Sequence, residues 1–157
     1  MNQTEQFVMK FYQSININNP FTLSMEYVSD KLNMYLIYWK NTSALAIYNE
    51  KCFMFINTNL SKQKQWQDFG HEMYHYFFDE TNYSILNESY AEYGETKADY
   101  FAYHFCVPSF MLHQFKEVSV YDVMELFNVE YDFALRRLKM YEHKVLSRRN
   151  NYAGTYF

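Results

Sequence analysis

Five consecutive residues of this 157-residue chain, at positions 71–75, carry two histidines and a glutamate in the order H-E-x-x-H. His71 and His75 are four positions apart, so on a helix both imidazoles project from one face and can reach one metal ion. Glu72 lies about 100° around the helix axis, so it can sit beside a bound water without being a ligand. The simpler alternative is a helix with two surface histidines. With five histidines in the chain, such a chance match is roughly a one-in-a-hundred event.

A catalytic zinc site usually adds a third protein ligand and leaves one position for water. The metzincin pattern is excluded, because it requires Gly and His at the positions that Phe78 and Thr81 occupy. Glu95 and Asp99 follow the second histidine and share one face of a predicted helix at i, i+4. We therefore expect Glu95 to be the third ligand and Asp99 to hold one imidazole in the required tautomer. The alternative is a solvated acidic first turn, which the helix dipole favours in any case.

Other polar residues are weaker candidates for the third ligand position. Glu92 lies one turn earlier on a similar face and is the reserve third ligand, while Glu88 and Asp79 are less suitable. His104 and His113 lie among aromatic residues. A lone histidine in such surroundings is more often a hydrogen-bonded core residue than a metal ligand.

The composition indicates one helix-rich domain. Hydrophobic residues make up 49% and charged residues 20% of the chain, so a substantial core can form. Only 3 Gly and 2 Pro are present, which leaves little turn chemistry for an all-β sandwich or barrel. Two cysteines, the absence of a leader-like N-terminus and the absence of a long apolar run predict a cytoplasmic protein without a membrane span. The net charge of −4 argues against binding nucleic acid by bulk charge alone.

The spacing of the apolar residues predicts an α+β fold that is mostly helical. Helices are expected near 4–14, 22–32, 61–78, 92–107, 119–127 and 130–144. Three short runs rich in aromatic and β-branched residues, 34–39, 44–48 and 52–56, predict a small antiparallel sheet. We expect this sheet to pack on the H-E-x-x-H helix and the third-ligand helix, with a helix-turn-helix-like pair at the C-terminal end.

Three segments, taken in order, resemble the ImmA/IrrE metallopeptidase family. In that family a strand leads into an H-E-x-x-H helix, followed by a segment of the form E-x-x-A-N-x-F-A and then a proline. The counterparts here are residues 71–75, the sequence Glu-Thr-Lys-Ala-Asp-Tyr-Phe-Ala at 95–102, and Pro108. A helix-turn-helix-like element at 120–138 extends the resemblance, which covers residues 23–145.

The chain departs from the family pattern in two places. Met73 and Tyr74 replace the usual Leu-Gly between the glutamate and the second histidine, which puts a bulky ring beside the metal helix. Asp99 replaces the usual Asn, as in the E-x-x-x-D signature of thermolysin-like zincins, and should still orient a histidine. Neither departure removes a ligand.

The resemblance implies a zinc-dependent endopeptidase. By carry-over, His71, His75 and Glu95 match the metal ligands, and Glu72 matches the catalytic acid/base. Zn²⁺ is the expected cofactor, although the same ligands accept several first-row metals. Relatives of this size are typically encoded by prophages and integrative elements, where they cleave the element's helix-turn-helix repressor and so induce it. A repressor protein is therefore the expected substrate.

The chain is expected to form one domain with three parts: a zincin-like core at 1–115, helix-turn-helix-like helices at 116–145, and a basic, flexible tail at 146–157. Strand 52–56 is expected to pair with an extended substrate by edge addition. A basic cluster near the C-terminus could dock the repressor, or it could be a solvated helix face that suits the dipole. Its members are Arg136, Arg137, Lys139, Lys144, Arg148 and Arg149.

A non-proteolytic regulator is the main alternative function. In that case the metal is structural or absent, and the C-terminal helices bind a repressor or DNA. The acidic composition weakens direct DNA binding, whereas the basic C-terminus favours it. A degradative, thermolysin-like enzyme is a third option, which the lack of a secretion signal disfavours.

Overall fold

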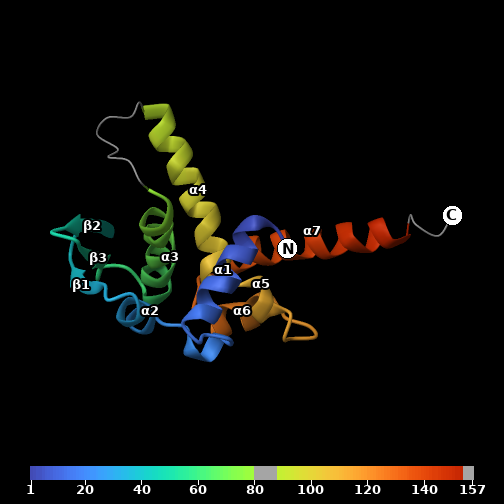
Figure 1. Cartoon of the computed structure of the whole chain (residues 1–157). Coiled ribbons are helices and arrows are strands. Elements are labelled where there is room, and N and C mark those ends of the chain that lie inside the picture. The colour runs from blue at the N-terminus through green and yellow to red at the C-terminus, as the bar shows by residue number, and fades with distance from the viewer. Residues whose placement is uncertain (80–87, 154–157) are drawn as a thin grey trace.

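The computed structural model describes residues 1–79 and 88–153. Its fold is α+β and mostly helical, as predicted, with one small sheet at one end of the molecule (Figure 1). None of the described helices is long and apolar enough to cross a membrane. In chain order, the elements are α1 (Gln3–Ser14), the 3₁₀ turn η1 (Pro20–Thr22), α2 (Met25–Lys31), β1 (Tyr35–Trp39), β2 (Ala44–Tyr48), β3 (Lys51–Asn57), α3 (Lys62–Phe78), α4 (Glu88–Cys106), α5 (Ser109–Leu112), α6 (Val120–Phe127) and α7 (Tyr131–Ala153).

The sheet is mixed, so the prediction of an antiparallel sheet is wrong for one pair of strands. β3 lies between the other two strands, antiparallel to β2 and parallel to β1. The β2–β3 hairpin forms because Asn49 and Glu50 both adopt the left-handed conformation that tight hairpin turns require. Met54 and Ile56 of β3 are fully buried, which suits the central position. The three runs have similar compositions, so the sequence does not reveal which strand is central. The parallel or antiparallel direction of each pair depends on which strand that is.

The central position of β3 also overturns the predicted role of residues 52–56 in substrate binding. Both edges of β3 are paired, so no further strand can be added to it. The free edges of this sheet belong to β1 and β2. β2 and β3 both contact α3, which lies between the sheet and α4 (Figure 1).

A close contact between α3 and α4 positions the H-E-x-x-H motif. Gly70 immediately precedes the motif, and a Cβ atom placed there would lie 2.6 Å from Cys106 Sγ and 3.4 Å from Phe105 Cδ1. A larger residue at position 70 would therefore push the two helices apart. The Cys106 thiol also donates to the Trp66 carbonyl at 3.4 Å, so each helix is fitted to the other here.

A fully buried arginine ties the C-terminal helix to the core. Arg137 donates to the Val107 carbonyl at 3.0 Å and to the Ser109 hydroxyl at 2.7 Å. Ser109 donates to the buried Glu5 carboxylate at 2.6 Å, and Glu5 also pairs with Lys144. Burial lowers the pKa of Arg137 to about 10, so the guanidinium stays charged at neutral pH. The predicted basic cluster is therefore smaller than the sequence indicates, because Arg137 points into the core.

α6 and α7 form the expected C-terminal helical pair. Ser119 caps α6 in a capping box, and Asn128 ends that helix in the left-handed conformation. α7 runs on to Ala153, well beyond the predicted end near residue 144, and its last part extends away from the body (Figure 1). Residues 146–153 of the predicted flexible tail are therefore helical, because no Gly or Pro interrupts this part of α7, and the rest of that tail lies outside the described residues.

The close contact at Gly70 yields a test by substitution. Gly70→Ala should lower the free energy of unfolding by about 1–3 kcal/mol, because the new methyl group meets Cys106 Sγ. In a Cys106→Ala background the same substitution should be neutral or stabilising, since the sulfur is gone and Ala favours a helix by about 1 kcal/mol over Gly. Urea unfolding of the four proteins measures this double-mutant cycle. Equal effects of Gly70→Ala in both backgrounds would show that the thiol contact does not limit helix packing.

Candidate metal centre

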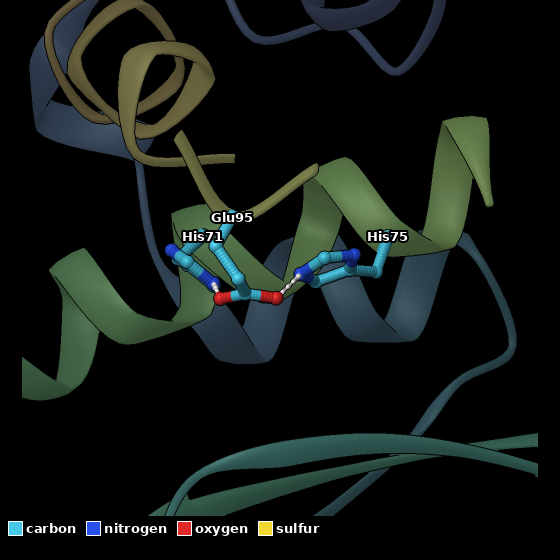
Figure 2. A group of neighbouring side chains, drawn as sticks. All are labelled: His71, His75 and Glu95. Carbon is cyan, nitrogen blue, oxygen red and sulfur yellow. Dashed lines mark hydrogen bonds and ion pairs between the residues drawn. The ribbon is translucent and has the colours of Figure 1, made fainter. Parts of the chain in front are cut away.

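α3 and α4 bring the three predicted ligands to one point. His71 and His75 project from the same face of α3, and the Glu95 carboxylate reaches between their imidazoles from α4 (Figure 2). His71 Nε2 lies 2.9 Å from one Glu95 oxygen, and His75 Nε2 lies 3.2 Å from the other. One ligand atom from each of the three residues lies within 4.8 Å of the others. The two imidazoles and the carboxylate therefore converge on a volume the size of one ion.

A second carboxylate holds each imidazole from its other side. Asp99 Oδ1 lies 2.7 Å from His71 Nδ1, where the sequence places a carboxylate that orients a histidine. Asp79, which follows the last residue of α3, pairs with His75 Nδ1. When Nδ1–H donates to a carboxylate, the Nε2 lone pair is left free to bind a metal ion. Both histidines thus have the arrangement that metal-binding histidines usually show.

The donor atoms fit a divalent metal ion. A neutral imidazole has one N–H, and the carboxylate at Nδ1 accepts it, so Nε2 and the facing Glu95 oxygen are both acceptors. A cation between them, either a metal ion or a second proton, satisfies both. Ligands placed about 2.0–2.2 Å from one tetrahedral ion lie about 3.4 Å apart. The observed separations, 2.9 Å from His71 to one Glu95 oxygen and 3.2 Å from His75 to the other, are about 0.5 and 0.2 Å shorter.

Glu72 lies beside this group without belonging to it. Burial raises the pKa of Glu72, while the neighbouring His71 and His75 partly oppose the rise. The backbone N–H of Leu45 on β2 faces the Glu72 carboxylate and favours the charged form, which lowers the pKa slightly. A partly buried carboxylate that faces one backbone donor and is not itself a ligand can accept and return a proton.

The remaining polar candidates lie away from the three ligands. Glu92 is exposed on α4 and is not part of the three-residue group that the described residues form. The side chain of Glu88 lies outside the described residues. His104 is a buried core residue, as expected, and burial together with Arg137 lowers its pKa to about 3. The expected hydrogen bond is not found, because neither ring nitrogen has a partner among the described residues. His113 is hydrogen-bonded to the Tyr141 hydroxyl at 2.6 Å.

The sequence prediction misses the role of two contributors to the site. Asp79 was predicted only as a weak alternative ligand, although its i, i+4 spacing from His75 is the signal that could have identified it as the partner of that imidazole. The Leu45 N–H has no comparable signal in the sequence, because a backbone donor can be identified only when the strand is placed beside α3.

Met73 is fully buried, and the Tyr74 ring packs edge-on against the ring of His75, at 5.6 Å between centroids.

Comparison with solved structures supports the fold. A transcriptional regulator of Mycobacterium tuberculosis superimposes with a TM-score of 0.62 at 14% sequence identity, over 88% of this chain. This chain spans 56% of that regulator, so just over half of the larger protein has a counterpart here. At this level of identity the likeness concerns the fold alone.

Comparison of sequences gives the family. A protein of the phage-like element PBSX of Bacillus subtilis, XkdA, is 29% identical over 149 residues, which cover 92% of this chain and 75% of XkdA. YqaB, an uncharacterised protein of the same organism, is 27% identical over 146 residues, covering 90% of this chain and 85% of YqaB. The IrrE N-terminal-like domain of the peptidase M78 family matches residues 34–139, which include α3 and α4 with the three converging side chains. The chain therefore belongs to the peptidase M78 family and is a metallopeptidase-type protein.

Proposed function

We propose that the chain is a zinc-dependent endopeptidase that cleaves a helix-turn-helix repressor and thereby induces a prophage or an integrative mobile element. The observation that carries the proposal is the convergence of His71, His75 and Glu95, with Glu72 alongside as a non-ligating carboxylate. Membership of the M78 family supports the peptidase reaction. The relative XkdA, named as a protein of a phage-like element, supports the connection with a mobile element.

His71, His75 and Glu95 would hold the zinc ion, with Asp99 and Asp79 fixing the two imidazoles. Zinc bound by such ligands polarises a carbonyl group and lowers the pKa of water towards about 7. The protein's part is to keep both Nε2 atoms unprotonated and aimed at one point. The two carboxylates at the Nδ1 positions do so by accepting the N–H of each ring.

Glu72 is the proposed proton carrier. Its carboxylate accepts the proton of the attacking water and returns it to the leaving amine when the peptide bond breaks. The Leu45 N–H restrains the carboxylate during this exchange. Because the same backbone donor belongs to β2, a free edge of the sheet, an extended substrate pairing with β2 would lie directly beside Glu72. β2 thus takes the role that the sequence assigns to residues 52–56.

Replacement of the proposed proton carrier tests the reaction. Glu72→Gln should reduce cleavage of the helix-turn-helix repressor substrate by at least about 10²-fold, because the amide cannot accept a proton. Zinc content and melting temperature should stay within error of the unsubstituted protein, since Glu72 is not a ligand. Glu125→Gln, at an exposed position on α6, is the matched control and should cleave normally. Undiminished cleavage or induction by Glu72→Gln would favour a non-proteolytic regulator.

The carboxylates behind the histidines give an independent prediction. Asp99→Asn and Asp79→Asn should each weaken zinc binding by about 10–100-fold, because an amide holds the imidazole less well in the required tautomer. Competition with a chromophoric chelator measures the affinity. Asp30→Asn, on the exposed side of α2, should leave the affinity unchanged. Wild-type affinity in both substituted proteins would exclude the proposed role of the outer carboxylates.

A further inference from the structure

A cavity of about 590 Å³ lies beside the candidate metal centre, between α3, α4 and the start of α7. His71 and Asp99 form part of its wall, so the cavity borders the imidazole of one proposed metal ligand. Pockets that enclose small ligands usually measure about 300–1,000 Å³. The cavity is therefore large enough for a bulky side chain of a substrate whose scissile bond lies at the metal centre.

The charged groups on the α3 side of the cavity already have partners. Lys64 pairs with Asp68 at 3.1 Å, and Asp99 pairs with His71 at 2.7 Å. At the start of α7, the Glu130 carboxylate accepts a hydrogen bond from a serine hydroxyl at 3.0 Å. A charged side chain that entered from the substrate would meet one cation, Lys64, and carboxylates that are bonded to a lysine, a histidine and a serine hydroxyl. Each of these charged groups is thus already engaged by a neighbouring side chain.

α7 and α4 supply the apolar part of the wall. The rings of Phe133 and Tyr103 stack with centroids 4.4 Å apart, and Met140 lies two turns further along α7. The Arg136 guanidinium packs over the Tyr103 ring, 5.4 Å from its centroid, so it extends the stack. Asp132 lies one turn before Arg136 on the same helix. Apolar surface and shape are therefore what this side of the cavity can recognise.

We propose that this cavity receives a large apolar side chain, aromatic or long aliphatic, from the substrate residue next to the scissile bond. Phe133 and Met140 of α7, with Tyr103 of α4, determine which side chains fit. This inference rests on the proposed peptidase function and adds the class of residue at which the protein cuts. It also makes the C-terminal helical pair a part of the substrate site.

The test uses the zinc-loaded full chain and repressor variants in which each residue flanking the scissile bond is changed in turn to Phe, Leu, Ala, Arg or Glu. At one flanking position, kcat/KM for Phe or Leu should exceed kcat/KM for Ala by at least about tenfold. The variants with Arg or Glu at this position should likewise be cleaved with a lower kcat/KM than those with Phe or Leu. Met140→Trp fills the cavity and should cut this preference at least about tenfold. Glu142→Trp adds the same bulk at an exposed position on α7 outside the cavity and should keep the preference.

Met140→Ala enlarges the cavity and serves as a second variant if Met140→Trp folds poorly. It should raise the relative cleavage of a Trp-containing substrate. A preference for Arg or Glu at the selective position, or an unchanged preference in both Met140 variants, would overturn the inference while leaving the peptidase proposal intact. Failure of the unsubstituted protein to cleave any repressor would instead contradict the peptidase proposal itself, so the two failures are distinguishable.

Discussion

The contact between α3 and α4 at Gly70 governs the geometry of the candidate metal centre. Two proposed ligands come from α3 and the third comes from α4, so their separation depends on the distance between two helices. Metal sites require their ligands within about 0.5 Å of the productive positions. The absence of a side chain at Gly70 lets Cys106 approach the α3 backbone, and the next residue, His71, is thereby brought to Glu95 and Asp99. The packing of the core thus sets the chemistry at its edge.

Helix packing brings the side chains of the candidate metal centre together, and charge and hydrogen bonding then set their orientation. Each imidazole lies between two carboxylates, one at Nδ1 and one shared at Nε2. Three carboxylates surround the two imidazoles, and a divalent cation between them compensates this negative charge. The same carboxylates prevent the rings from turning, so little order has to be gained when the ion binds. Glu72 lies outside this group, near the backbone N–H of Leu45 on β2, so the proposed proton carrier is separate from the proposed ligands.

The ligand group could be predicted from the sequence, but much of its surroundings could not. The helical spacing of His71 and His75 and the i, i+4 spacing of Glu95 and Asp99 define two local faces, and these need no knowledge of the tertiary fold. The order of the strands and the Leu45 donor depend on contacts between distant segments, which local periodicity does not encode. Burial of Arg137 is of the same kind, because its neighbours Arg136 and Lys139 are exposed and have similar chemistry.

The contrast between Arg136 and Arg137 explains how the C-terminal helices can serve the active site. Arg137 points into the core and holds the Val107 carbonyl and the Ser109 hydroxyl, which lie just after α4 and at the start of α5. Arg136 turns towards the cavity and packs on Tyr103 of α4. α7 is therefore fastened to the helix that carries Glu95, so the cavity wall and the third proposed ligand move together. In the proposed substrate pocket such a wall would select a side chain by shape, because a poorly fitting residue cannot be accommodated by moving α7 without disturbing the buried hydrogen bonds of Arg137.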